Sequence, residues 1–215
     1  AMRLTLGSSP CPNDTFIFDA MLHHKIDTEG LDFDVVFCDV EELNKLAFDA
    51  KLDITKLSYN AFTYCVNHYI LLDSGSALGN NCGPLLIKKP STILNKTSKI
   101  AIPGKYTTAN MLFSIAFQDY HNKKETLFSI IENNILDGKV DAGVIIHENR
   151  FTYQKKGLEK VQDLGEFWHK KTGLPIPLGG IVVKRSLSLS VQQKIERGLR
   201  RSVEYALRNR NSASE

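Results

Sequence analysis

The chain has 215 residues, of which 42% are apolar and 24% are charged, and its formal net charge is +3. This length fits one large domain or two small ones, and this composition is typical of a folded globular protein. The small positive charge mildly favours anionic small molecules, but no Lys/Arg stripe of the kind that nucleic acid requires is present. We therefore expect a small-molecule partner and no nucleic acid.

Five arginines gather near the C-terminus: Arg197, Arg200, Arg201, Arg208 and Arg210. They fall in or just after an amphipathic helix that the apolar spacing predicts over Ser190–Arg208. A solvated helix face explains this cluster better than a binding surface does.

The four cysteines stand singly, without a C-x-x-C pair or a Cys/His spacing typical of metal ligands. We therefore expect neither a structural zinc site nor a disulfide framework, and a reduced setting fits best. The start of the chain lacks the pattern of an export signal, and no apolar run reaches the length of a membrane span. These features favour a cytoplasmic protein that has no membrane partner.

Strands and helices alternate in the first third of the chain. Met2–Leu6 is predicted as a buried strand, and the Gly and Pro residues that follow it break regular structure. Asn13 and Asp14 are expected to cap the first helix. The next expected elements are a strand at Phe33–Cys38, a helix capped by Asp39, a strand at Ile54–Leu57 and a helix at Tyr59–Val66. Such alternation favours a mainly parallel sheet that is covered on both faces.

The rest of the chain repeats this alternation after the glycine-rich segment 75–83. The expected elements are strands at Ile100–Ile102, Ala142–Ile146 and Gly180–Lys184, and helices at Thr108–Tyr120, Ile130–Asp137 and Gly165–Lys171. Segment 75–83 is no dinucleotide fingerprint, because it does not join a first strand to a first helix.

Two extended segments bounded by Gly and Pro, Leu85–Lys88 and Leu178–Val183, would let the region between them fold as an inserted lobe. We predict a two-lobed α/β fold with two hinge-crossing strands. Lobe 1 is expected to comprise residues 1–88 and 182–215, and lobe 2 residues 91–178. A ligand would then bind in the cleft between the lobes. A single continuous α/β sheet is the alternative.

Three segments that follow predicted strands carry hydroxyl and amide groups at the start of a helix: Ser8–Thr15, Lys56–Asn60 and Pro103–Ala109. Ligands of such sheets meet the carboxyl ends of strands, where helix N-termini offer N–H groups and a positive dipole. For any single segment, ordinary helix capping is the simpler explanation. Cys11 is an alternative candidate as an activated thiolate, since a helix start lowers a thiol pKa.

His147 follows the apolar run Ala142–Ile146 and is expected at the carboxyl end of a buried strand, facing the cleft. Imidazole titrates near neutral pH, which suits a general base. Glu148, Arg150 and Tyr153 are placed to orient the ring or the ligand, or they belong to a helix surface. A hydrogen-bonded structural histidine is the alternative interpretation.

Six stretches of the chain together resemble the 1,4-dihydroxy-6-naphthoate synthase family of the futalosine route to menaquinone. These stretches are Ser9–Phe18, Thr55–Tyr59, Gly75–Gly79 with Gly83-Pro84, Pro103-Gly104 with Thr107–Ala109, Ile145–Glu148 with Arg150–Tyr153, and Gly173–Gly179. They are long, follow the order of the family and span nearly the whole chain.

The resemblance implies a two-lobed periplasmic-binding-protein-like fold of type II, used as a carbon–carbon lyase without a metal or organic cofactor. The expected reaction converts cyclic dehypoxanthine futalosine to 1,4-dihydroxy-6-naphthoate and a three-carbon fragment. It further implies that His147 is the proton acceptor and that the substrate, a small carboxylate, is bound by Lys56, Leu57, Ser58, Thr107, Thr108 and Ala109. Cys11, Asn13, Asp14 and Arg150 are expected to line the cleft. Members of the family usually continue past the helix that is expected to end near Arg210.

Two other functions remain open at this point. A chorismate dehydratase of the same pathway would share the architecture, and so would a non-catalytic solute-binding protein for a small carboxylate. The segment Ile145–Glu148 and the Ser-Pro-Cys-Pro-Asn-Asp start favour the synthase.

Overall fold

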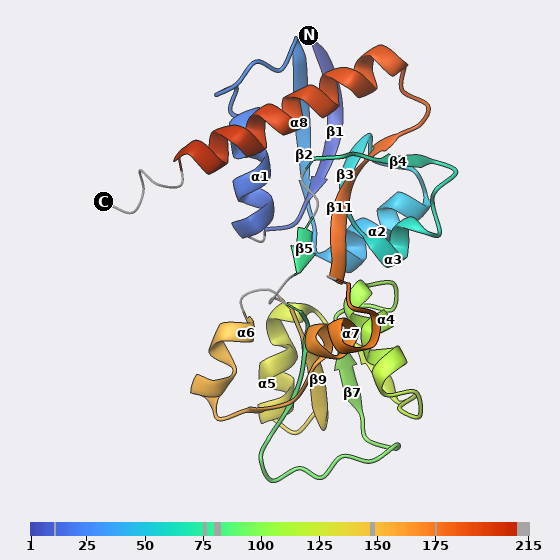
Figure 1. The fold of residues 1–215 in the computed structure, drawn as a ribbon, viewed down its shortest axis with the longest axis vertical. Coiled ribbons are helices and arrows are strands. Elements are labelled where there is room, and N and C mark those ends of the chain that lie inside the picture. The colour runs from blue at the N-terminus through green and yellow to red at the C-terminus, as the bar shows by residue number, and fades with distance from the viewer. Residues whose placement is uncertain (11, 75–76, 80–82, 147–148, 175, 210–215) are drawn as a thin grey trace. The chain divides into compact units, whose positions relative to one another are not determined.

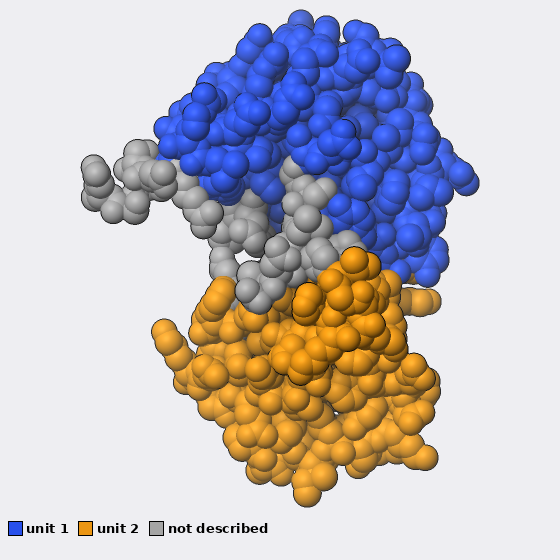
Figure 2. All heavy atoms as spheres, in the orientation of Figure 1, with its two compact units in different colours: residues 1–77, 179–215 blue, residues 78–178 orange. Residues whose placement is uncertain are grey.

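A computed structural model describes residues 1–10, 12–74, 77–79, 83–146, 149–174 and 176–209, without the side chains of 12, 13, 77–79, 149, 177 and 178. The chain forms two compact units, shown in two colours in Figure 2. Unit 1 comprises residues 1–77 and 179–215, and unit 2 comprises residues 78–178. The first boundary lies before the predicted residue 88, because strand β6 (Leu85–Lys88) hydrogen-bonds to two strands of unit 2.

Unit 1 is built on a six-stranded sheet, and Figure 1 labels its elements. Its strands are β1 (Met2–Ser8), β2 (Leu31–Phe37), β3 (Ile54–Ser58), β4 (Tyr69–Leu71), β5 (Ala77–Gly79) and β11 (Ile176–Lys184). Its helices are α1 (Pro12–Leu22), α2 (Val40–Phe48), α3 (Tyr59–Phe62) and α8 (Leu189–Asn209). Strands β5 and β11 each contain a boundary between the units, so the chain passes from one unit to the other within them.

The strand order of this sheet is β2-β1-β3-β11-β4, and β5 pairs with β11. Strands β1, β2 and β3 are parallel, as the alternation of strand and helix predicts. Strand β11 is antiparallel to both β3 and β4. The sheet is therefore mixed and not mainly parallel, because β11 returns from unit 2 and enters it in the opposite direction.

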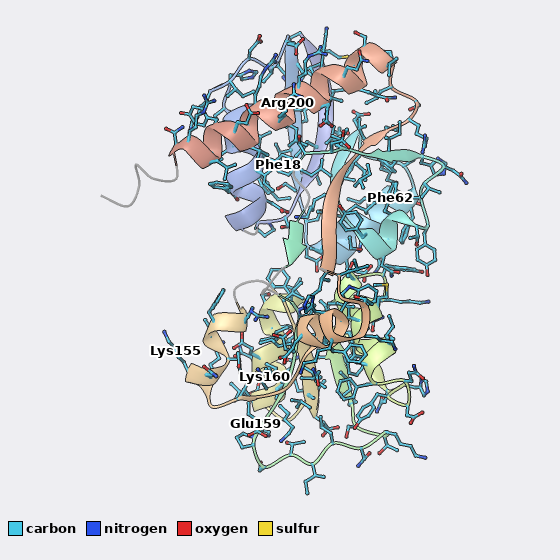
Figure 3. All side chains as sticks on the ribbon, viewed as in Figure 1. Phe18, Phe62, Lys155, Glu159, Lys160 and Arg200 are labelled. Carbon is cyan, nitrogen blue, oxygen red and sulfur yellow. The ribbon has the colours of Figure 1, made fainter. Side chains whose placement is uncertain are left out.

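The main core of unit 1 lies between the sheet and helices α1 and α8. Phe18 of α1 is buried there with residues of β1, β3, β11 and α8. Ser202 of α8 joins the two helices, because its hydroxyl donates to the carbonyl of Ile17 and accepts from the amide of Met21. Arg200 lies on the exposed side of α8, and Figure 3 labels it together with Phe18.

Some arginines of the C-terminal cluster form ion pairs, and others are exposed to solvent. Arg197 and Arg201 both pair with Glu29, at 2.7 and 3.0 Å, and Arg208 is exposed. The described arginines thus form a helix face, as expected, whereas Arg210 lies outside the described residues.

The helix starts follow the predicted caps in one case and differ in another. Asp39 caps α2, and its side chain accepts from the amide of Glu42 at 2.9 Å. Helix α1 begins at Pro12, so Asp14 lies inside its first turn and does not cap it. Proline suits this first position because its missing N–H would have no partner there. The carboxylate of Asp14 instead points to Ser9 and Lys56.

Unit 2 contains a five-stranded sheet of order β10-β6-β9-β7-β8. Besides β6, its strands are β7 (Ile100–Ile102), β8 (Lys123–Glu125), β9 (Ala142–Ile145) and β10 (Glu159–Asp163). Its helices are α4 (Thr108–Ala116), α5 (Ile131–Leu136), α6 (Asn149–Thr152) and α7 (Leu164–Thr172), with 3₁₀ turns at Phe128–Ile130 and Gln154–Lys156. Strand β7 is parallel to β8 and β9, whereas β6 is antiparallel to β9 and β10.

Both faces of this second sheet are buried. Leu86 and Val144 contribute to a cluster with α4 and α7, while their neighbours Leu85 and Ile145 contribute to a cluster with α5. Successive residues of a strand point to opposite faces, so a fully apolar run fills both layers. Within the described part of the chain, no helix is both long and apolar enough to cross a bilayer.

Candidate functional site

The candidate segment Lys56–Asn60 begins on β3 of unit 1, where Lys56, Leu57 and Ser58 are all buried. Ser58 caps α3, because its hydroxyl accepts from the amide of Ala61 at 3.2 Å. The buried Asn44 of α2 donates to the same hydroxyl, and its side-chain oxygen accepts from the amide of Ser58, each at 3.2 Å. Helix α2 therefore holds the end of β3 in place through Asn44.

A buried ion pair joins the segment Lys56–Asn60 to the other candidate segment of unit 1, Ser8–Thr15. The ammonium of Lys56 lies 2.6 Å from Oδ1 of Asp14, and their side chains are 10% and 2% exposed. The other carboxylate oxygen of Asp14 accepts from the hydroxyl of Ser9 at 2.6 Å and from its amide at 3.1 Å. The structure thus brings together the loop after β1, the first turn of α1 and the end of β3.

The third candidate segment begins helix α4 of unit 2. Thr107 is the cap: its hydroxyl accepts from the amide of Asn110 at 3.2 Å and donates to the carbonyl of Gly104 at 2.7 Å. Thr108 and Ala109 follow in the first turn, and all three residues are buried. Capping thus accounts for Thr107, while the helix dipole makes this turn attractive to an anion.

Arg150 makes its contacts inside unit 2. Its guanidinium donates to the carbonyl of Gly83 at 2.5 Å and to the carboxylate of Asp163 at 3.3 Å. Asp163 also caps α7 by accepting from the amides of Gly165 and Glu166. Arg150 thus links helix α6 to the residue that caps α7, and its described contacts are structural.

His147 and Cys11 lie outside the described residues, as does the side chain of Asn13. The strand that precedes His147 in the sequence, β9, is fully buried, as predicted. Helix α6, which follows, is held by Thr152, whose hydroxyl donates to the buried carboxylate of Glu132 at 3.2 Å.

Cys38, which lies beside the loop that follows β1, is not an activated thiol. Cys38 follows β2, and its amide donates to the carbonyl of Ser8. Burial raises the pKa of its thiol, and the nearby carboxylates of Glu42 and Asp39 raise it further. Across the described ranges, no group of three or more His, Cys, Asp or Glu side chains is arranged to hold a metal ion.

Three residues near these segments were not predicted from the sequence: Asn44, Asn110 and Asp163. Asn44 is a polar residue beside Leu43 on the buried face of α2, and that position was the available signal. Asn110 donates from its amide to the carbonyl of Lys105, while its Oδ1 is buried without a partner among the described residues. Asp163 precedes the helix expected at Gly165, where a cap is common.

Several known proteins are similar to this chain. A 1,4-dihydroxy-6-naphthoate synthase of Thermus thermophilus is 42% identical over 204 residues, which cover 95% of this chain and 74% of the relative. The synthase of Streptomyces coelicolor is 40% identical over 211 residues and covers 96% and 74%. A crystal structure of an Archaeoglobus fulgidus protein matches 98% of this chain and 79% of its own, with a TM-score of 0.92 and 37% identity.

More distant structures show the fold. A Candida albicans protein described as having the generic periplasmic binding protein fold covers 99% of this chain and 74% of its own, with a TM-score of 0.74 at 12% identity. The predicted α/β periplasmic-binding-protein-like fold is therefore confirmed. The family described as menaquinone biosynthesis matches residues 4–215. This match and the two synthases place the chain in the menaquinone biosynthesis family.

Proposed function

We propose that this chain is a 1,4-dihydroxy-6-naphthoate synthase, a carbon–carbon lyase that acts on cyclic dehypoxanthine futalosine in the cytoplasm. The observation that carries this proposal is the identity of 40–42% to two synthases over 95–96% of the chain. At this identity and coverage, we infer the same reaction type. The likeness to solute-binding proteins concerns the fold, and a fold by itself does not define a function.

His147 is the proposed proton acceptor. A reaction of this kind removes a proton, releases a three-carbon fragment and gains driving force from forming an aromatic ring. An imidazole that titrates near neutral pH accepts such a proton without a cofactor. Strand β9, which precedes His147 in the sequence, is buried, and Thr152 of helix α6, which follows, donates to the buried carboxylate of Glu132.

The proposed substrate contacts lie on two elements. Lys56, Leu57 and Ser58 belong to β3, and Thr107, Thr108 and Ala109 belong to the first turn of α4. An ammonium group and a helix N-terminus both favour a bound anion. The substrate of the proposed reaction carries a carboxylate, so these two segments match its charge.

The test of the reaction is direct. The purified protein is incubated with cyclic dehypoxanthine futalosine or with chorismate, and products are identified by mass spectrometry. We expect 1,4-dihydroxy-6-naphthoate from the first substrate and no reaction with the second. Consumption of chorismate would identify the dehydratase instead, and binding without any product would identify a solute-binding protein.

The role of His147 is tested by His147→Ala. We expect turnover to fall by roughly 10²–10⁴-fold, the usual range for a lost general base, with the dissociation constant of the product nearly unchanged. His121→Ala is the matched control, because His121 also lies in unit 2 and is exposed. Wild-type turnover by His147→Ala would rule out the proposed base.

A further inference from the structure

Lys56 and Asp14 form the most buried ion pair among the described residues. Removing two charges from water costs free energy that their attraction offsets only in part, so such a pair is weak evidence for a stabilising role. Most other ion pairs of the described part have at least one partner more than a third exposed. The pair is therefore unusual in this protein and calls for a functional explanation.

The ammonium of Lys56 has hydrogen-bonding capacity that the described residues do not use. A lysine ammonium carries three N–H donors. One of them meets Oδ1 of Asp14, and no other acceptor within the described ranges bonds to Nζ. Because the side chain is nine-tenths buried, water reaches the remaining donors poorly. Buried donors of this kind normally have a partner, and an anion is the partner that suits an ammonium.

Asp14 is itself held in place. Its second oxygen accepts two hydrogen bonds from Ser9, so the carboxylate cannot turn away from Lys56 without breaking them. Gly179 of β11 leaves room for the stem of the Lys56 side chain. A Cβ at this position would lie 3.2 Å from Cε of Lys56 and 3.0 Å from the carbonyl oxygen of Leu57. Asp14 thus holds the ammonium, while the stem of Lys56 lies close to the backbone of Gly179.

We propose that Asp14 is a positioning residue, which holds the ammonium of Lys56 so that its remaining donors bind the carboxylate of the naphthoate. This inference rests on the proposed function and adds the origin of carboxylate selectivity. Asp14 acts through Lys56 and not on the ligand, since its own negative charge would repel a carboxylate. It replaces the expectation that Asp14 lines the ligand site directly.

The test compares two ligands that differ only in the carboxylate: 1,4-dihydroxy-6-naphthoate and 1,4-dihydroxynaphthalene. Their dissociation constants are measured anaerobically by titration calorimetry, and the ratio between them is the selectivity. We expect the wild-type protein to prefer the naphthoate by about 10-fold or more, since hydrogen bonds to charged groups are among the strong ones. Lys56→Met is expected to bring the ratio close to one.

Asp14→Asn distinguishes positioning from packing. Asparagine has the same shape and retains an acceptor for Ser9, but it no longer attracts the ammonium. We expect selectivity to fall several-fold while the affinity for 1,4-dihydroxynaphthalene stays at its wild-type value. A purely structural role would weaken both ligands equally. Lys56→Met alone leaves the buried carboxylate of Asp14 without its cation and can be unstable for that reason. The double variant Lys56→Met/Asp14→Asn removes both charges and provides a folded reference in that case.

The matched control is Lys88→Met, which breaks a lysine–carboxylate pair of equal length in unit 2. Lys88 lies 2.6 Å from Glu159, whose side chain is 47% exposed, and Figure 3 labels Glu159. We expect its selectivity to equal that of the wild-type protein.

The possible failures are distinct. If the wild-type protein makes the naphthoate and Lys56→Met keeps full selectivity, this inference is wrong and the proposed function stands. If only Asp14→Asn keeps full selectivity, Asp14 does not position Lys56 and the inference is again wrong. A wild-type protein that forms no naphthoate overturns the proposed function, and if it also shows no carboxylate selectivity, it overturns both.

Discussion

The two units bring polar groups to the ends of their strands by different means. Unit 1 uses a buried charge pair between α1 and β3, whereas unit 2 uses the hydroxyl-capped turn of α4. Each unit also contains a hydroxyl cap, Ser58 in unit 1 and Thr107 in unit 2. The hydroxyl of Ser58 also accepts from the side chain of Asn44, which belongs to another helix. The described hydrogen bonds of the Thr107 hydroxyl stay within the first turn of α4 and the loop before it. The two caps are therefore alike in chemistry, but only the cap in unit 1 is supported by a side chain from another helix.

Two glycines at packing contacts, one in each unit, differ in the space around them. A Cβ at Gly83 would lie 2.5 Å from Cα of Gly165, where the segment before β6 passes the start of α7. In unit 1, a Cβ at Gly198 of α8 would lie 3.6 Å from the sulfur of Met21, which is an ordinary contact. Unit 2 thus depends on a close approach of two backbones, and the α1–α8 contact of unit 1 tolerates a methyl group.

The largest effect on stability is expected from Gly83→Ala. Backbone atoms cannot move aside as a flexible side chain can, so we expect a loss of about 3 kcal/mol, at the upper end for overpacked sites. The only tryptophan of the chain, Trp168, packs against a core cluster of unit 2, so its fluorescence during urea unfolding follows this unit.

Gly198→Ala is the control, and it is expected to change stability in the opposite direction. In a helix interior, alanine is more favourable than glycine by up to about 1 kcal/mol, and the space beside Gly198 accommodates the methyl group. Far-ultraviolet circular dichroism follows its unfolding. Equal losses in both variants would show that the close approach in unit 2 has no special cost.

The second prediction concerns the two caps. Ser58→Ala removes the cap of α3 and leaves the buried amide of Asn44 without its acceptor, so we expect a loss of about 2 kcal/mol. Thr107→Ala removes one cap and should cost about 1 kcal/mol. Ser58→Thr and Thr107→Ser keep the hydroxyl and should stay close to the wild-type stability in urea unfolding. Equal costs for both alanine variants would mean that Asn44 adds nothing.

The sequence predicts local elements well because their signals are local. The strands at β1, β2, β3 and β9 and the cap at Asp39 follow from apolar spacing and cap chemistry in neighbouring residues. The direction of β11 does not, since it depends on where the chain re-enters the first sheet. The boundary at residue 77 was missed for the same reason: β6 reads as a connecting segment until its pairing with β9 and β10 is known.

The candidate site divides in the same way. The segments that contain Ser58 and Thr107 were predicted because hydroxyl groups before a helix are visible in the sequence, and both residues are caps in the structure. The contacts of Lys56 with Asp14 and of Ser58 with Asn44 join residues 42 and 14 positions apart, and no spacing rule predicts them. Asp14 was expected as a cap, but a buried lysine on a neighbouring strand determines its orientation.

The smallest effect is expected from Glu29→Gln, which tests the surface pairing of α8 in unit 1. Hydrogen bonds from Arg197 and Arg201 lower the pKa of Glu29 from 4.5 to about 2. A carboxyl whose pKa is lower in the folded state stabilises it above pH 4.5, and this contribution is lost as the pH falls toward 2. The variant should therefore melt slightly below the wild-type protein at pH 7, and the difference should shrink at pH 3 and at high salt. Glu166→Gln, which breaks a single pair within α7 of unit 2, is the control and should show a smaller difference at pH 7. A Glu29→Gln difference that is the same at both pH values would contradict the assignment of this stability to the Glu29 carboxylate.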